Sequence, residues 1–381
     1  MDTGTYFDYC ATTPVHPDVR NQILRTLDVG FGNPSSLHWA GRNAKLVLNR
    51  ARVEVAEGIG CRPDEIVFTS GATEADNLAL FGTLRLFPPK EAHLITSAIE
   101  HHAVLHAAGQ LEREGYSVTY LPVDRYGLVN PDDVRRSIRP ETKLISVMYV
   151  NNETGAIQPV AEVGKITREH GILFHTDAVQ AVGLFDVDVD DLNVDMLSLS
   201  AHKIYGPKGV GALYVRSGME IRPLIFGGPQ EKSLRAGTEN VPGIAGLGAA
   251  MTLVRQHRAE ERARLFGLRE RLVNGMQALG PGVIVNGSPK ATAPHVVSVS
   301  FMGADAEMLL IRLNAEGIAV SLGSACNSES VEPSHVLTAM RLPQEQIEAT
   351  LRISLGMPTT PQEIDLLLEA LTREVPRVAV Q

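Results

Sequence analysis

The order of apolar and polar positions predicts an α/β fold for most of the chain. Between about residues 40 and 215, short apolar runs alternate with segments in which apolar residues recur every three or four positions. Several of the runs are almost continuously apolar, which is typical of strands that are covered on both faces. The alternation predicts a mostly parallel sheet, with ligand sites in the loops beyond the carboxyl ends of its strands. The predicted strands are residues 65–69, 93–97, 117–122, 144–150, 173–175, 196–200 and 212–215.

Helical spacing predicts the elements between these strands, and the pattern changes after Gly237. Residues 43–57 and 73–84 have the apolar stripe of helices. After Gly237, three glycines between positions 243 and 248 punctuate an apolar stretch, and a long charged segment follows. This order predicts a smaller α+β domain from about residue 260. Its predicted elements are a helix with the buried stripe Leu265, Leu268, Leu272, Met276 and Leu279, an extended run at 296–301 and a helix at 306–316.

Composition and charge narrow the classes of function. The 381 residues include 35 basic and 44 acidic side chains, a net charge of −9, and no Lys/Arg-rich run, so nucleic acid is not an expected direct partner. The proportions, 44% hydrophobic and 21% charged, are those of a globular protein. No run of about 18 apolar residues and no cationic, apolar leader is present, so neither a membrane span nor a secretory signal is expected. The three cysteines, Cys10, Cys61 and Cys326, form no CxxC pair, which predicts a reducing, cytoplasmic location.

Lys203 is the first candidate for chemistry. It closes an apolar run and precedes the glycine-rich turn Gly206-Pro207-Lys208-Gly209. One interpretation is a lysine at the end of a strand that reaches solvent. The other is a Schiff-base lysine, whose amine is kept neutral by burial or by a neighbouring cation so that it can attack a carbonyl. The local sequence alone leaves both open.

Two further motifs favour the second interpretation. Ser70-Gly71-Ala72-Thr73 lies where a predicted strand meets a predicted helix, and free N–H groups at a helix start suit a phosphate. Alternatively, Thr73 is only an N-cap, with Asp76 completing a pattern like a capping box. Asp177 ends an apolar strand 26 residues before Lys203, and a carboxylate there needs a charged partner. A protonated pyridine nitrogen would be such a partner.

With these motifs in place, nearly the whole chain resembles the pyridoxal-phosphate (PLP) enzymes of aminotransferase class V. The resemblance is specifically to the cysteine desulfurases of the nitrogenase and iron–sulfur-cluster type. The matching segments are Tyr9-Cys10-Ala11-Thr12-Thr13-Pro14, Gly32-Asn33-Pro34-Ser35-Ser36, Ser70-Gly71-Ala72-Thr73-Glu74, Glu100-His101, Val150-Asn151-Asn152-Glu153-Thr154-Gly155, Asp177 with Gln180, His202-Lys203, Arg235-Ala236-Gly237-Thr238, Gly323-Ser324-Ala325-Cys326 and Arg352-Ile353-Ser354.

The resemblance implies the fold and its division. The expected fold is the PLP-dependent transferase fold type I, an α/β architecture with a mostly parallel seven-stranded sheet in a large domain. We expect residues 16–259 to form this PLP-binding domain. Residues 1–15 and 260–381 would form a smaller α+β domain that carries the catalytic cysteine loop.

The resemblance also implies a role for each matching residue that would hold the cofactor ring. Lys203 would carry PLP as a Schiff base, and Asp177 would keep the ring nitrogen protonated so that the ring accepts electrons. Gln180 would donate to the phenolic oxygen, and His101 would stack on the ring.

Other matching residues would bind the phosphate. Thr73, Ser200 and His202 are implied ligands of this group, with help from the amide of Ala72. Thr238 would reach the phosphate of a neighbouring subunit, so the resemblance implies a homodimer with shared active sites.

Three residues are implied for the substrate. Asn152 and Arg352 would hold its carboxylate, because a planar guanidinium suits bidentate binding. Asn33 would line the same pocket.

The histidines have competing interpretations. Without its motif, His101 would be read as a core histidine satisfied by hydrogen bonds; with the Glu100-His101 motif, ring stacking and acid–base chemistry are favoured. His102 is expected to be structural. His175 has no second histidine or cysteine at metal spacing, so no metal site is predicted.

Cys326 decides the chemistry within the family. Its small, polar surroundings suit a mobile, exposed loop, although a free cysteine is commonly a small buried hydrophobe. A thiolate here could attack a substrate sulfur, and the long stretch from Gly323 to His335 resembles the longer-loop desulfurases. Asn327 departs from the threonine that is frequent in the family. Cys10 and Cys61 are interpreted as packing residues.

The implied reaction converts L-cysteine to L-alanine and leaves sulfur on Cys326 as a persulfide. Lys203 would remove the Cα proton, and His101 would donate or accept a proton. A protein sulfur acceptor is then an expected partner: an iron–sulfur scaffold, or a tRNA- or DNA-sulfuration protein. The alternatives are a selenocysteine lyase or other class V lyase, a sulfur-relay or scaffold subunit with vestigial catalysis, and a metal- or nucleic-acid-binding module, which charge and ligand spacing disfavour.

Overall fold

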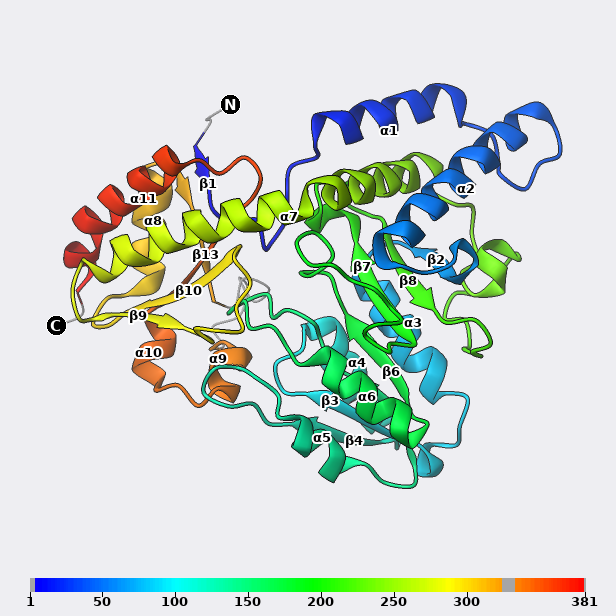
Figure 1. The fold of residues 1–381 in the computed structure, drawn as a ribbon, viewed down its shortest axis with the longest axis horizontal. Helices are drawn as coiled ribbons and strands as arrows, with labels where there is room; N and C mark the ends of the chain where they lie inside the picture. The colour runs from blue at the N-terminus through cyan, green and yellow to red at the C-terminus, as the bar shows by residue number, and fades with distance from the viewer. Residues whose placement is uncertain (1–3, 324–332, 380–381) are drawn as a thin grey trace.

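A seven-stranded sheet forms the centre of the larger part of the molecule (Figure 1). The computed structural model of the chain describes residues 4–323 and 333–379. All neighbouring strands of the sheet are parallel except β8, which is antiparallel to both of its neighbours, so the mostly parallel α/β prediction is confirmed. In spatial order the strands are β2 (Ile66–Thr69), β8 (Gly211–Val215), β7 (Met196–Ser200), β6 (Leu173–Asp177), β5 (Thr142–Ser146), β3 (His93–Ser97) and β4 (Ser117–Leu121).

The predicted strands agree with this sheet except at β5. The apolar run predicted a strand at 144–150, but β5 ends at Ser146. Beyond it the chain stays buried: the Val147 N–H donates to the His175 carbonyl, and the Tyr149 N–H donates to the Asp177 carbonyl. The apolar run is therefore longer than the strand, because the chain remains buried after the strand's hydrogen-bond pairing ends.

Helices cover both faces of the sheet. The apolar side chains of α3 (Ala72–Leu84) and α4 (His102–Arg113) pack on one face. On the other face lie α2 (Trp39–Ile59), α6 (Val160–His170) and the first half of α7 (Val241–Gln277). The remaining helices of this region are α1 (Pro17–Val29), which packs against α7, and α5 (Pro131–Ser137). None of the helices in the described ranges is long and apolar enough to cross a membrane.

A second, antiparallel sheet forms in the C-terminal region and has its own core. Its order is β12 (Ser321–Leu322), β13 (Thr350–Ser354), β10 (Val296–Phe301) and β9 (Val283–Asn286). The predicted extended run is β10, and the predicted helix at 306–316 is α8 (Ala306–Ala315). Near the start of the chain, β1 (Thr5–Tyr6) pairs in parallel with β11 (Ile318–Ala319), so this strand joins the C-terminal region. Its other helices are α9 (His335–Ala339), α10 (Gln344–Glu348) and α11 (Pro361–Glu374).

One helix runs through both regions (Figure 1). The sequence analysis placed the apolar stretch with its glycines before a helix. In the structure this stretch instead forms the first turns of the 37-residue α7. A Cβ at Gly246 would lie 2.9 Å from Ile23 of α1, and one at Gly248 would lie 2.8 Å from the Cα of Ala51 in α2. The glycines thus permit close helix packing rather than ending a helix. The division at 259/260 falls inside α7 and stays a prediction.

Candidate active site

The carboxyl ends of the central strands open into a cavity of about 660 Å³. Asp177 ends β6, Ser200 ends β7, and Lys203 ends the short 3₁₀ turn that follows. The cavity brings together ten residues predicted from the sequence. These are Ala72, Thr73, His101, Asn152, Asp177, Gln180, Ser200, His202, Lys203 and Arg352.

Three predicted residues are not placed in this cavity. Asn33 is exposed in the loop between α1 and α2, where its side chain accepts from the Ser35 N–H. Thr238 is exposed before α7. Cys326 lies outside the described residues.

The amine of Lys203 is held at the cavity wall. Its Nζ donates to the Cys10 carbonyl and, at 2.8 Å, to the Ala11 carbonyl. Both acceptors belong to the N-terminal segment, more than 190 residues away in the chain. Lys203, in the turn after β7, therefore points across the site rather than along the strand into solvent.

The start of α3 supplies free backbone N–H groups to the cavity. The helix begins at Ala72, its N-cap is Gly71, and no side chain caps it. The capping-box alternative is wrong: Asp76 lies inside the helix and is fully buried against the sheet. Unsatisfied N–H groups with the hydroxyl of Thr73 beside them suit an anion. Lys208, to which the sequence analysis gave no role although it follows the Lys203 motif, lines the same cavity.

His202 is neutral at ordinary pH. Burial and the nearby positive Lys203 lower the pKa of its imidazole to about 4. Its Nδ1 lies 3.2 Å from the hydroxyl of Thr12. A neutral ring oriented through Nδ1 leaves Nε2 as the atom that faces a ligand.

Two buried carboxyl groups lie at the cavity. Burial raises the pKa of Asp177 to about 6, against the hydrogen bond from the Val179 N–H at 2.9 Å and the positive Lys203. Burial and the negative Asp177 raise the pKa of Asp76 well above its ordinary value. Oδ1 of Asp76 lies 3.6 Å from Nε2 of the buried His175. A pair of buried carboxyl groups attracts a proton or a protonated ring nitrogen.

His101 is also neutral. It caps α4, where its Nδ1 accepts from the Ala103 N–H at 3.1 Å. Burial, followed by the charge of Lys203 and the neighbouring histidines, lowers the pKa of His101 to about 4. Because Nδ1 is the acceptor, the ring hydrogen is on Nε2. His101 therefore has features of both predicted roles. One ring nitrogen is hydrogen-bonded to the backbone, as in a core histidine, and the side chain also lines the cavity, as a cofactor-binding residue would.

The neighbouring histidines pack with one another or within the core. The His102 ring centroid lies 4.9 Å from that of His106 and 4.6 Å from that of His335. His175 is fully buried, with its two nitrogens each 2.9 Å from a serine hydroxyl. These contacts are structural.

Arg352 is buried on β13 with a partner that the sequence analysis missed. Its Nη2 lies 2.8 Å from Asp8 Oδ1, and its Nη1 donates to the Asn152 carbonyl at 3.2 Å. The Nε has no hydrogen-bond partner among residues 4–323 and 333–379. Asp8 and Arg352 are 344 residues apart, so no sequence spacing could reveal the pair. The guanidinium is held rigidly while part of its donor set stays available.

Glu100 gives the stability of the protein a predictable pH dependence. It is fully buried, and its Oε1 accepts from the Ser97 hydroxyl at 2.5 Å and the Met148 N–H at 2.9 Å. Burial raises the pKa of Glu100 to about 8. The folded state then keeps a proton that the unfolded state loses above about pH 4.5. The contribution of this proton to the free energy of unfolding is fully present below pH 4.5 and is lost as the pH rises through 8.

We expect Glu100→Gln to reduce this loss. The amide oxygen can accept both hydrogen bonds, and the amide does not ionise. Between pH 7 and 9 the free energy of unfolding of the variant should fall by about 1 kcal/mol less than that of the parent protein. Denaturant unfolding at several pH values measures this, with the exposed Glu162→Gln as control. Parallel pH curves for the Glu100 variant and the parent would contradict the prediction.

Comparisons with known proteins agree with this fold and site. The family model described as Aminotransferase class-V matches residues 5–367, and the chain belongs to this family. Within it, the chain is 49% identical to the cysteine desulfurase IscS of Methanosarcina thermophila, over 98% of this chain and 93% of the relative. It is 46% identical to the cysteine desulfurase IscS of Dictyoglomus turgidum, over 99% and 96%.

Solved structures give the same result. A NifS-like protein superposes with a TM-score of 0.93 at 37% identity, covering 98% of this chain and all (100%) of the other. SspA in complex with cysteine superposes with a TM-score of 0.83 at 42% identity, covering 92% and 98%. The fold is therefore that of NifS-like proteins, the PLP fold type I.

Proposed function

We propose that this protein is a PLP-dependent cysteine desulfurase, which converts L-cysteine to L-alanine and leaves the sulfur on Cys326 as a persulfide. The observation that carries the proposal is the convergence of ten predicted residues on one cavity. They come from segments that begin before residue 80 and end after residue 350. The cysteine desulfurase relatives support the same assignment.

The residues present fit the cofactor. Lys203 would hold it covalently, and Asp177 would bind its ring nitrogen, since this buried carboxyl group lies beside the second buried carboxyl group of the cavity. The free N–H groups of α3, with Thr73, Ser200 and His202, would bind its phosphate. Gln180 would donate to its phenolic oxygen, and the ring of His101 would stack on it. When bound, PLP supplies an electron sink that stabilises negative charge at Cα of an amino acid.

The side chains of this protein then perform the remaining steps. Arg352 and Asn152 orient the substrate carboxylate, and the amine of Lys203 takes the proton from Cα. His101, whose neutral ring carries its hydrogen on Nε2, donates a proton at the substrate sulfur. The Cys326 thiolate forms an S–S bond as the Cβ–S bond breaks, so that cysteine and an enzyme thiol yield alanine and an enzyme persulfide. Each acid–base step contributes about 10²–10⁴-fold to the rate.

The proposal includes partners and a location. A homodimer would bring the exposed Thr238 of each subunit to the phosphate of the other, and Asn33 would complete the substrate pocket. In the cytoplasm, a sulfur-accepting protein of an iron–sulfur, tRNA or DNA pathway would take the persulfide sulfur. The free thiols of Cys10 and Cys61 agree with a reducing compartment.

Product analysis tests the proposed function. We expect the PLP-loaded protein, given L-cysteine and a thiol reductant, to form alanine and sulfide in equal amounts over many turnovers. Selenocysteine should be turned over less efficiently, as judged by kcat/KM. A protein that binds PLP but forms no alanine from cysteine would contradict the assignment, and a preference for selenocysteine would favour a selenocysteine lyase.

A further inference from the structure

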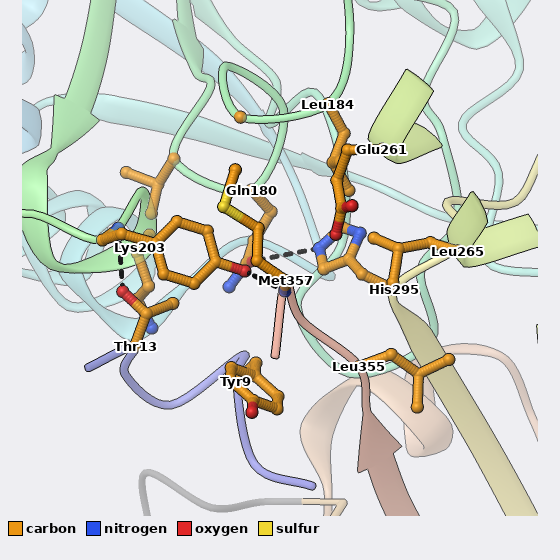
Figure 2. Close-up of a pocket in the computed structure, with 13 residues that line it drawn as sticks. Tyr9, Thr13, Gln180, Leu184, Lys203, Glu261, Leu265, His295, Leu355 and Met357 are labelled. Carbon is orange, nitrogen blue, oxygen red and sulfur yellow. Dashed lines mark hydrogen bonds between the residues drawn. The ribbon is translucent and has the colours of Figure 1, made fainter. Parts of the chain in front are cut away.

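His295 lines a second, smaller pocket, which shares Gln180 and Lys203 with the cofactor cavity (Figure 2). It immediately precedes β10 of the C-terminal sheet, whereas Gln180 follows β6 of the central sheet. The Nε2 atom of His295 is 3.1 Å from Oε1 of Gln180, and the histidine side chain is buried. This contact joins the second sheet to the proposed ligand of the cofactor's phenolic oxygen.

The contacts of Gln180 fix which way its amide points. Its Nε2 donates to the Cys10 carbonyl at 3.2 Å. Lys203 donates to that same carbonyl, so both donors converge on one acceptor. A flipped amide would place Oε1 against the carbonyl of Cys10, two acceptors with no hydrogen between them. The amide nitrogen therefore faces Cys10 and the lysine, and Oε1 faces His295.

Only one form of His295 completes this arrangement. Oε1 of Gln180 is an acceptor, so Nε2 of His295 must carry a hydrogen. Burial, followed by the positive charges of Lys203 and Arg352, lowers the pKa of the imidazole to about 4, and the ring is neutral at pH 7. The single ring hydrogen is thus on Nε2, and Nδ1 is an acceptor without a partner in the part of the chain that the structure describes.

We propose that His295 is a positioning residue for the cofactor: by donating to Oε1 it holds the Gln180 amide with its N–H groups directed at the cavity. The proposal rests on the proposed function, because the group that Gln180 would meet there is the phenolic oxygen of PLP. Nε2 of Gln180 carries two hydrogens, and Cys10 takes one. Without His295 only the single hydrogen bond to the Cys10 carbonyl holds the amide, and a rotated amide would direct its carbonyl oxygen at the phenolic oxygen and repel its negative charge.

The visible absorbance of the PLP-loaded protein tests this directly. A donor on the phenolic oxygen withdraws negative charge and so favours loss of the proton from the linkage nitrogen at Lys203. In His295→Leu we expect the pH midpoint of the visible band to rise by about one unit and the dissociation constant of PLP to rise about 10-fold. His295→Gln places an amide donor near the position of Nε2 and should restore both values.

A double-mutant comparison of His295 and Gln180 distinguishes a positioning role from a general loss of stability. If His295 acts through Gln180, the double variant His295→Leu/Gln180→Leu should shift the midpoint no further than Gln180→Leu alone. His93→Leu is the matched control, because His93 is also buried and is hydrogen-bonded to Thr142 and Thr119 away from the cavity. Additive shifts, an unshifted midpoint in His295→Leu or an equal shift in His93→Leu would each overturn the proposal.

A measurement without cofactor keeps this proposal distinct from the proposed function. Nitrogen chemical shifts of His295 in the apoprotein should show the Nε2–H form at pH 7. The opposite ring form would overturn the positioning role even if the desulfurase activity is present. If His295→Leu fails to fold, the pair His295→Gln and His295→Asn serves instead: the shorter asparagine should show the shift and glutamine should not, and equal midpoints would refute the proposal.

Discussion

Replacing Lys203 by alanine should abolish alanine formation, with a loss of more than about 10⁴-fold. The variant removes both the covalent attachment of PLP and the base that takes the Cα proton. In the parent protein the amine reaches the Cys10 and Ala11 carbonyls from the end of the turn after β7, and alanine has no group that reaches this position. Borohydride trapping followed by peptide mass spectrometry should find the pyridoxyl adduct on Lys203 in the parent protein and none in the variant.

The control for this experiment is Lys165→Ala, a change at an exposed lysine of α6. It should retain activity, the visible absorbance and the adduct on Lys203. An adduct elsewhere in the parent protein, or undiminished activity in Lys203→Ala, would refute the proposed role of this lysine.

Replacing Cys326 by serine should eliminate persulfide formation and sulfur transfer while PLP stays bound. The visible absorbance is then unchanged, but cysteine yields no alanine, because a hydroxyl cannot form the S–S bond that releases the product. Persulfide-selective alkylation and amino-acid analysis measure the two losses. The position lies outside the described residues, so this expectation comes from the sequence and the proposed function.

The other two cysteines, Cys10 and Cys61, cannot replace Cys326 as the nucleophile. Burial raises the pKa of the Cys10 thiol, and burial with neighbouring carboxylates raises the pKa of Cys61 to about 12. Both stay protonated at neutral pH and are poor nucleophiles. Cys61→Ser should therefore retain full activity. A persulfide on Cys61, or normal alanine formation by Cys326→Ser, would show that the nucleophile has been misassigned.

The strands of the central sheet were predictable because a strand covered on both faces must be apolar throughout. The same reasoning misplaced the end of β5, since the chain stays buried after its ladder ends at Ser146. It also placed the glycines of α7 before the helix. They lie inside it, where the lack of a side chain allows close contact with α1 and α2. Local sequence reports burial and conformational freedom, but not which neighbour requires them.

The site was predictable to the extent that each motif is local. Asp177, Ser200 and Lys203 follow consecutive strands, so a sheet of this topology must bring them together. The pair of Asp8 and Arg352 is different, because a contact across 344 residues depends on the whole fold. Asn33 and Thr238 are exposed in the single chain, and the role implied for Thr238 lies at the phosphate of a neighbouring subunit.

The length of α7 has a consequence for how the protein comes apart. At 1.5 Å per residue its 37 residues span about 55 Å. Its side chains up to Val254 fill the core under the large sheet, and those from Leu265 onward fill the core under the small one. Unwinding either half exposes an apolar stripe and frays the end of the other half. Heat should therefore melt the two cores in one concerted transition, even though each has a sheet of its own.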